Sequence, residues 1–315
     1  MEGIRRSALL NRLGSLGQVT KKDAMECDIL QNVCSTLGFF YFDLADHPDL
    51  LLLYRKLLGF SQAYFTQSLG SKQQNDHQSE LYAPIPELVP AQHFTDSGDT
   101  QGYEAVGTSG GLLAGSVNGY ESLKFAFHPP VMVEAPLKGD IIKQNEDIMQ
   151  EFQHTAHGAL MQVLTCLCGD EILNLHHPDR PSRTNSVFLR YPHDAPSKAV
   201  GHNEHNDMGT LTFLLAAQWG LQVRDPLDGI WKYVRPSPTR AVVNVGDSLN
   251  FISEGRLLSA MHRVIQINDG NHSDRYSIAF FLRPDDDAEY RHSDGTLMNA
   301  ATWHKIRMER KHART

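Results

Sequence analysis

The chain has 315 residues, of which 41% are hydrophobic and 21% charged, a composition typical of a globular protein with a sizeable core. Its formal net charge of −8 offers no basic surface for nucleic acid or acidic lipid. No apolar run is long enough to span a membrane, and the first residues lack the continuous apolar core of a signal peptide. We therefore expect a cytoplasmic protein without a nucleic-acid or membrane partner.

The four cysteines do not form a recognisable metal or disulfide pattern. Cys27 and Cys34 are seven residues apart in a predicted helix, and Cys166 and Cys168 flank a single residue. These spacings do not match a zinc motif, and four cysteines are few for a disulfide scaffold of this length. We expect reduced thiols in a cytosolic protein.

Helices and one aromatic strand are expected at the start of the chain. Apolar residues recur at helical spacing over Ala24–Leu37, and Gly38 is placed to end that helix. The aromatic run Phe39–Phe42 favours a buried strand. The segment His47–Leu69 again has helical periodicity, with a proline in its first turn.

The periodicity fades between about residues 70 and 136, where Gly, Pro, Ser and Asn are frequent. Short β-like runs at Tyr103–Val106 and Leu123–Phe127 indicate that part of this stretch is folded. A long irregular stretch inside a folded chain is often a lid or a pocket wall, which is the role we expect here. The clearest helix of the chain, Asp140–Leu167, follows and is broken at Gly169.

After about residue 182 the chain is rich in short strands separated by turn residues. Strands at such spacing predict a sandwich or a jelly roll. We therefore divide the chain into a mostly helical region at 1–180, a β-rich core at 181–293 and a tail at 294–315, helical around Ala300–Met308. The predicted strands are Ser186–Tyr191, Gly209–Ala216, Leu221–Arg224, Ile230–Val234, Ala241–Val245, His262–Gln266 and Tyr276–Arg283.

An H-x-D pair lies at the start of this core, in the segment GHNEHND. Side chains alternate along a strand, so His205 and Asp207 would project to the same side and Glu204 to the other. A third ligand would have to come from a neighbouring strand, and His262 opens a later β-rich run, HRVIQI. Two imidazoles and one carboxylate suit iron(II) and leave further positions open. Zinc could occupy the same residues and would then imply hydrolysis.

A guanidinium and a hydroxyl share one face of the strand RYSIAFFL. Arg275 opens this run and Ser277 follows two residues later, among apolar neighbours that indicate burial. A buried arginine needs an anionic partner, and a guanidinium beside a hydroxyl is a good receptor for a carboxylate.

The C-terminal motifs in combination resemble one enzyme family. They are Tyr191-Pro192, His205 and Asp207, the segments WGLQV and NVGD, His262-Arg263-Val264 and Arg275-Tyr276-Ser277. This pattern is similar to that of the iron(II)/2-oxoglutarate-dependent dioxygenases of the isopenicillin N synthase-like superfamily. The resemblance implies an α+β fold: a double-stranded β-helix (jelly-roll, cupin-like) core, flanking N-terminal helices and a long central helix.

The resemblance also implies a role for each site residue. His205, Asp207 and His262 would bind iron(II) as the catalytic metal. Arg275 and Ser277 would hold the distal carboxylate of the cosubstrate 2-oxoglutarate, with a further hydrogen bond from Tyr191. With dioxygen, such an oxidoreductase converts 2-oxoglutarate to succinate and CO2. It oxidises a C–H bond of a small molecule by hydroxylation, desaturation or oxidative rearrangement.

The segments NFISEGRLLSAMHRV and ATWHKIRMER resemble fungal members of the family that tailor secondary metabolites. We expect the substrate pocket at Tyr82–Phe127, with Trp219 and Phe281 as further walls. Two alternatives stay open: a 2-oxoglutarate-independent oxidase of the isopenicillin-synthase kind, and a non-catalytic ligand-binding protein on the same fold.

The chain departs from the family pattern at two places. An N-terminal strand with an I-P-x-I-D-type signal is not recognisable before Cys27, so that strand is missing or disguised. Val187 and Leu189 stand where many relatives have arginine and asparagine, which affects the details of cosubstrate contact.

Overall fold

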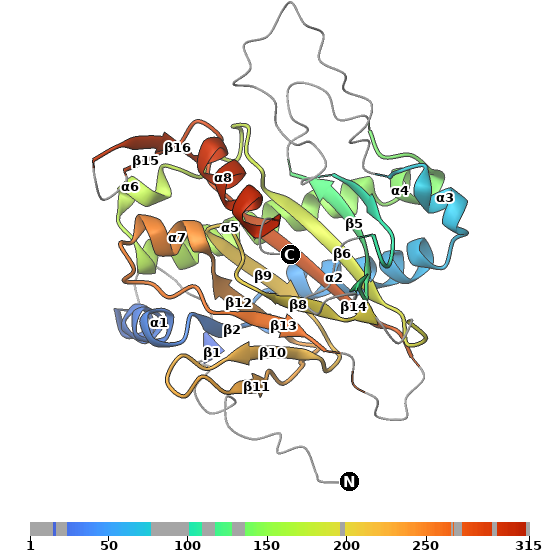
Figure 1. Ribbon diagram of the computed structural model, residues 1–315, viewed down its shortest axis with the longest axis horizontal. Coiled ribbons are helices and arrows are strands. Elements are labelled where there is room, and N and C mark those ends of the chain that lie inside the picture. The colour runs from blue at the N-terminus through green and yellow to red at the C-terminus, as the bar shows by residue number, and fades with distance from the viewer. Residues whose placement is uncertain are drawn as a thin grey trace, which may run out of the picture.

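Two antiparallel sheets face each other in this computed structural model, and helices cover the outer side of the larger sheet (Figure 1). The structure describes residues 15–16, 24–76, 101–108, 117–127, 136–195, 199–265, 267, 273–291 and 295–312.

The first helix and strand form where the sequence predicts them. Helix α1, Ala24–Thr36, ends as the amide of Gly38 donates to the Val33 carbonyl at 3.0 Å, with Gly38 at a φ of 76°. A Cβ at Gly38 would lie 2.0 Å from the Leu258 carbonyl oxygen, so this position needs glycine for space as well as for conformation. Strand β2, Phe39–Asp43, follows directly.

The remaining N-terminal helices agree with the predicted pattern except in one place. Helix α2, Pro48–Phe65, ends four residues before the predicted Leu69, where the short α3, Leu69–Gln73, begins. The prediction of a single helix over Asp140–Leu167 is wrong, because this segment divides into two helices. They are α4, Asp140–Lys143, and α5, Glu146–Leu167. The Asn145 side chain donates to the Ile141 carbonyl at 2.8 Å and so competes with helical hydrogen bonding at the break.

The irregular stretch at 70–136 is described only in part. Strands β3, Gly102–Glu104, and β5, Glu121–Ala126, match the predicted β-like runs, and β4, Val117–Asn118, lies between them. Residues 77–100, 109–116 and 128–135 lie outside the described residues, and with them most of the expected lid.

The C-terminal half contains all of the predicted strands. Short helices accompany them: α6, Asp170–Leu173, α7, Asp247–Ile252, and α8, Ala300–His312. The strands are β6 Asn185–Tyr191, β7 Ala199–Val200, β8 His202–His205, β9 Leu211–Leu215, β10 Leu221–Arg224, β11 Trp231–Tyr233, β12 Arg240–Val245, β13 His262–Val264, β14 Arg275–Leu282, β15 Glu289–Arg291 and β16 Leu297–Asn299.

The strand order confirms the predicted double-stranded β-helix. The large sheet has the order β1-β2-β12-β9-β14-β6-β5-β3, and the small sheet has the order β11-β10-β13-β8. Their described pairings are antiparallel except for that of β1, Ser15–Leu16, which runs parallel to β2. The N-terminal strand is therefore disguised rather than missing. Four strands of the large sheet precede residue 180, and the division of the chain at that point stays a prediction.

Apolar residues fill both sides of the large sheet. On its outer side, α2 and α5 pack against β14, with Phe60, Phe152 and Phe280 in the core between them. On its inner side, alternate residues of the strands meet the small sheet in a second cluster that includes Phe39, Val187, Leu189, Leu221 and Val223. This inner cluster surrounds the predicted site. Among the described residues, no helix combines the length and hydropathy needed to cross a membrane.

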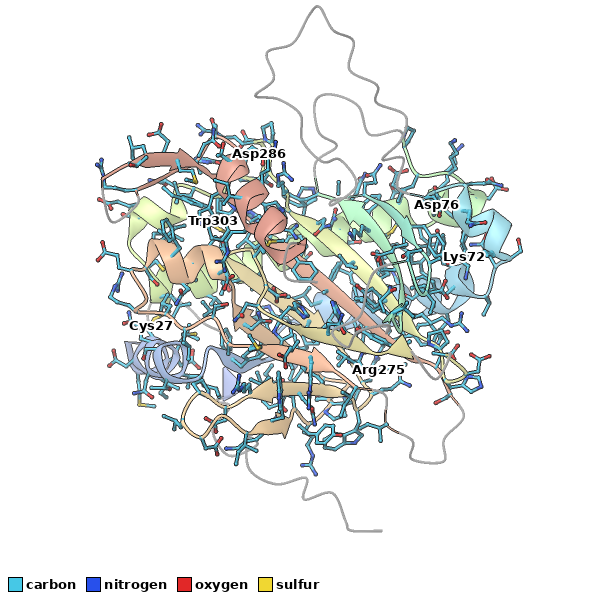
Figure 2. All side chains as sticks on the ribbon, viewed as in Figure 1. Cys27, Lys72, Asp76, Arg275, Asp286 and Trp303 are labelled. Carbon is cyan, nitrogen blue, oxygen red and sulfur yellow. A yellow bond between two sulfur atoms is a disulfide. The ribbon has the colours of Figure 1, made fainter. Side chains whose placement is uncertain are left out.

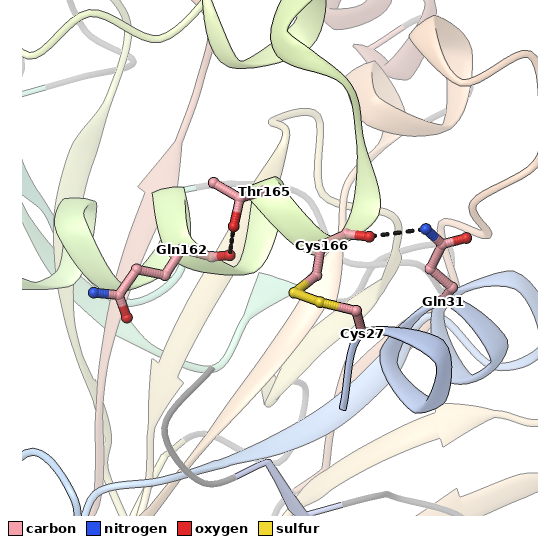
Figure 3. The surroundings of a disulfide bond; sticks show 5 residues. All are labelled: Cys27, Gln31, Gln162, Thr165 and Cys166. Carbon is pink, nitrogen blue, oxygen red and sulfur yellow. Dashed lines mark hydrogen bonds between the residues drawn. A yellow bond between two sulfur atoms is a disulfide. The ribbon is translucent and has the colours of Figure 1, made fainter. Parts of the chain in front are cut away.

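A disulfide corrects the expectation of four reduced cysteines. Cys27 of α1 and Cys166 of α5 are bonded, with their Cα atoms 4.9 Å apart, and Gln31 donates to the Cys166 carbonyl beside them (Figure 3). Cys34 and Cys168 are free thiols, and burial raises the pKa of the Cys168 thiol to about 11. The bonded partners are 139 residues apart, so local cysteine spacing could not reveal their pairing.

Candidate active site

Strand pairing brings the three predicted metal ligands together. His205 at the end of β8 lies opposite His262 at the start of β13. Asp207 lies two residues beyond the end of β8, and its Oδ1 is 3.5 Å from Nε2 of His205 and 3.6 Å from Nε2 of His262. One donor atom from each residue lies within 4.8 Å of the others, close enough to share one ion. We call His205, Asp207 and His262 the triad.

Backbone carbonyls orient both imidazoles of the triad. Nδ1 of His205 lies 2.7 Å from the Asn203 carbonyl oxygen, and Nδ1 of His262 lies 3.3 Å from that of Ala260. A carbonyl can only accept, so each Nδ1 carries a proton, and Nε2 is the nitrogen that the neutral imidazole would offer to a metal. Because both Nε2 atoms face Asp207, the two rings present metal-binding electron pairs to the same point.

Two donors fix the carboxylate of Asp207. Its Oδ2 accepts a hydrogen bond from Thr212 Oγ1 at 2.6 Å and another from Asn244 Nδ2 at 2.8 Å. Oδ1 therefore points toward the imidazoles. Burial by itself raises the pKa of Asp207, but His262, His205 and the Thr212 hydroxyl outweigh burial and hold the pKa below its usual range. The buried group is therefore a carboxylate with one oxygen directed at the two imidazoles.

Neither Thr212 nor Asn244 was identified from the sequence as a site residue. A signal was present, because each is a polar residue inside an apolar strand, in LTFLL and RAVVNV. The two are paired directly across β9 and β12, which places both side chains on the inner face.

A glycine allows the chain to fold closely around Asp207. A Cβ at Gly246 would lie 2.1 Å from the Gly209 carbonyl oxygen and 3.1 Å from that of Asp207. The next residue, Asp247, donates its amide to the Asp207 carbonyl at 2.6 Å. The NVGD segment therefore makes two hydrogen bonds to Asp207. The side chain of Asn244 donates to its carboxylate, and the backbone amide of Asp247 donates to its carbonyl oxygen.

The second predicted group lies at the start of β14. Arg275 is paired across the sheet with Tyr191 of β6, and its Cζ lies 4.7 Å from the centre of the Tyr191 ring. Its Nη1 donates to Ser277 Oγ at 3.3 Å and its Nε donates to the Trp219 carbonyl at 3.1 Å. The structure thus brings Arg275, Ser277 and Tyr191 together, and we call them the Arg275 group. The Trp219 carbonyl is a contact that the sequence did not reveal.

The Arg275 guanidinium is buried without a carboxylate contact among the described residues. Only 7% of Arg275 is exposed, and its Nη2 is buried and has no hydrogen-bond partner in the described part of the chain. Burial lowers the pKa of this guanidinium because it penalises the charged form. A buried cation with an unused donor is the arrangement expected of a receptor for an anionic ligand.

An apolar inner wall lies between the triad and the Arg275 group. Along β14, Ser277 is paired with Leu189, Ala279 with Val187, and Phe281 with Thr212, the donor to Asp207. Val187 and Leu189 are 8% and 6% exposed, so they supply apolar surface to this wall. Phe281 packs against this inner cluster, whereas the ring of Trp219 lies near Tyr233, 6.2 Å between centroids. A wall role for either ring stays a prediction.

The rings of Tyr120 and His202 connect the Arg275 group to the triad. Tyr120 lies 5.7 Å from Tyr191 and 4.5 Å from His202, measured between ring centroids. His202 in turn stacks on His205 at 4.3 Å with an interplanar angle of 21°. No sequence pattern indicated Tyr120 or His202 as a site residue, and the stacking shows that both belong to the wall of the site.

A second set of potential ligands, His193, Asp194 and Asp274, lies nearer the surface. Both carboxylate oxygens of Asp274 are occupied, since Oδ1 accepts from the His193 amide and Oδ2 pairs with Arg190 at 2.7 Å. This set therefore suits a surface ion-pair network better than a metal site.

Comparisons with known proteins agree with this geometry. A family model described as the 2OG-Fe(II) oxygenase superfamily matches residues 183–284. The 2-oxoglutarate-dependent dioxygenase gloE of Glarea lozoyensis is 38% identical over 92% of this chain and 84% of its own length. The dioxygenase frbH of a Dothideomycetidae species is 36% identical over 92% of this chain and 86% of its own.

A solved structure shares the fold at low identity. A full-length Neurospora crassa protein in complex with alpha-KG superposes with a TM-score of 0.75 at 19% identity, covering 95% of this chain and 96% of that one. The relatives and the fold lead to one assignment. The chain belongs to the 2OG-Fe(II) oxygenase superfamily and is a 2-oxoglutarate-dependent dioxygenase, an oxidoreductase of a family that uses iron(II), 2-oxoglutarate and dioxygen.

Proposed function

We propose that His205, Asp207 and His262 hold iron(II), and that Arg275, with Ser277 and Tyr191, binds the distal carboxylate of 2-oxoglutarate. The observation that carries the second assignment is the buried Nη2 of Arg275, which has no hydrogen-bond partner among the described residues. The donor set of the triad supports the first, because two imidazole nitrogens and one carboxylate oxygen suit iron(II) and leave positions open for other ligands.

Bound iron(II), 2-oxoglutarate and dioxygen supply the oxidising power for C–H oxidation in this family. The chain's own residues position these groups and exclude water. Thr212 and Asn244 keep one Asp207 oxygen away from the metal position, and the carbonyls of Asn203 and Ala260 set the imidazoles. The apolar inner wall, which includes Val187 and Leu189, limits water around the reacting groups.

We propose that the substrate is a small organic molecule of fungal natural-product biosynthesis, oxidised by hydroxylation, desaturation or oxidative rearrangement. The fungal origin of the relatives from Glarea and the Dothideomycetidae species supports this context. The apolar inner wall, which includes Val187 and Leu189, suits a small molecule with a largely apolar body. A cytoplasmic location and the absence of a nucleic-acid or membrane partner stay predictions.

The test uses a strain in which the gene is deleted. Purified protein with iron(II), 2-oxoglutarate and air is added to the metabolites that accumulate, and mass spectrometry follows substrate and product. We expect one compound to gain one oxygen, lose two hydrogens or be rearranged, with one succinate formed per turnover. Glu204→Gln is the matched control, since Glu204 immediately precedes His205 without belonging to the triad. Product formation without loss of 2-oxoglutarate would instead identify an oxidase.

A further inference from the structure

The inner face of β14 continues past the triad to a second arginine. Arg275, Ser277, Ala279 and Phe281 alternate along this face, and Arg283 follows two residues after Phe281, about 7 Å further at the rise of a strand. Since Phe281 is paired with Thr212, the donor to Asp207, Arg283 lies beyond the level of the triad on the side away from Arg275.

Arg283 is held rigidly at this position. It is 8% exposed, and its Cζ lies 5.3 Å from the centre of the Phe281 ring. Its Nη1 donates to Asn185 Oδ1 at 2.9 Å and to the Arg183 carbonyl oxygen. Asn185 is itself paired with Phe281 across β6 and β14, so these groups share the inner face. The guanidinium is therefore oriented before any ligand arrives.

A second buried guanidinium lies beside it. Arg183 is 9% exposed, and its Nε is buried without a hydrogen-bond partner among the described residues. The carboxylate of Asp286 is 3.9 Å from this Nε, too far for a hydrogen bond, and burial raises the pKa of Asp286. The neighbouring Asp285 is committed elsewhere, since it pairs with His177 at 2.6 Å.

These arginines line a hollow at the end of the barrel, near α8. The hollow is partly open to solvent, and Met208, the residue after Asp207, is in its wall. Figure 2 shows Asp286 and Trp303 at this end of the molecule and Arg275 at the other. Among the described residues that line the hollow, two guanidinium groups face one carboxylate, an imbalance that favours an anionic ligand. The lining includes Arg183, Met208, Arg283, Asp286, Trp303 and His304.

We propose that Arg283 and Arg183 form a subsite for a carboxylate of the primary substrate, which is therefore a carboxylic acid. This inference rests on the proposed function, because it assumes that the cosubstrate occupies the Arg275 end. A guanidinium binds a carboxylate through two parallel hydrogen bonds and so fixes orientation as well as position. The apolar part of the acid would lie against Phe281, with the C–H bond to be oxidised facing the triad.

The experiment uses the compound of the deletion-strain extract that the wild type converts, and the methyl ester of that compound. We expect the compound to be an acid, and Arg283→Gln and Arg183→Gln each to raise its KM at least 10-fold. The KM of the ester should be the same in the wild type and both variants. Arg224→Gln, which removes an exposed guanidinium on β10, is the matched control and should change neither KM.

A binding readout separates this inference from the proposed function. The anaerobic affinity for 2-oxoglutarate, measured from the visible band of the iron(II) complex, should be unchanged in both arginine variants, which also shows that they are folded. A neutral converted compound, or an acid whose KM is unchanged in both variants, would overturn the subsite alone. Failure of the wild type to form the band or to convert any compound in the extract would overturn the proposed function, and the subsite with it.

Discussion

The side chains of His205 and His262 lie opposite each other on β8 and β13, and each Nδ1 contacts the carbonyl oxygen of the residue two positions earlier. The same local arrangement thus occurs twice, and both Nε2 atoms point to one side of Asp207. Backbone carbonyls thus orient both imidazoles. The proposed iron site is therefore preorganised, and residues that position its ligands should matter nearly as much as the ligands.

The donors to Asp207 should control iron affinity. The double variant Thr212→Val, Asn244→Leu removes both hydrogen bonds to Oδ2 and lets the carboxylate rotate. We expect iron(II) affinity, measured anaerobically by competition with a chelator, to fall roughly 10- to 100-fold, the range typical of such supporting residues. Thr239→Val, at an exposed threonine near the start of β12, is the control. Unchanged iron affinity in the double variant would show that these bonds do not support the metal site.

Arg275 should determine cosubstrate affinity without affecting the metal. Arg275→Leu removes the charge-assisted hydrogen bonds to the carboxylate, each worth about 1.5–3 kcal/mol. We therefore expect the 2-oxoglutarate concentration for half-maximal turnover to rise at least 10-fold, with iron content by elemental analysis unchanged. Arg240→Leu, at an exposed arginine of β12, is the control. Loss of iron in Arg275→Leu would count against the assigned role.

Gly246 should be intolerant of even one methyl group. In Gly246→Ala the new Cβ would meet the Gly209 and Asp207 carbonyl oxygens at 2.1 and 3.1 Å, so the loop that carries Asp207 must shift. We expect a lower melting temperature and weaker iron binding. The control is Gly59→Ala in α2, where a Cβ meets nothing within 4 Å. That substitution should stabilise the helix by about 0.5–1 kcal/mol. Similar melting temperatures for the two variants would contradict this account.

The Cys27–Cys166 bond should stabilise the packing of α1 on α5. Loss of a native disulfide typically costs about 2–4 kcal/mol. We expect Cys27→Ser to unfold at lower denaturant concentration than the wild type, and a reductant to lower only the wild-type midpoint. Cys168→Ser, at a half-buried free thiol, is the control. Alkylation of four thiols in the unreduced, unfolded wild type, detected by mass, would contradict the pairing.

The sequence predicted what depends on local pattern. Strand alternation, the H-x-D order and the polar residues of RYSIAFFL were enough to select the triad and the Arg275 group as candidates. The residues that the sequence did not reveal depend on the register between strands that are distant in the sequence. Thr212 and Asn244 are recognisable as donors to Asp207 only when β9 and β12 are paired, and Asp207 lies beyond its strand, not on it as expected.

Other features were missed for the same kind of reason. Tyr120 reaches the site because β4 is paired with β7 just before His202, a contact between segments about 80 residues apart in the sequence. The two-residue strand β1 is too short to give a periodic signal, and the disulfide joins helices whose packing no local spacing encodes.

The central claim, that this triad binds iron(II) in a complex that also takes 2-oxoglutarate, has one direct test. Iron(II) and then 2-oxoglutarate are added to the protein without oxygen, and the visible spectrum is recorded for the wild type, His205→Ala and the control Glu204→Gln. We predict a weak charge-transfer band in the wild type and the control that is absent in His205→Ala. The absence of a band in the wild type, or its persistence in His205→Ala, would contradict the assignment.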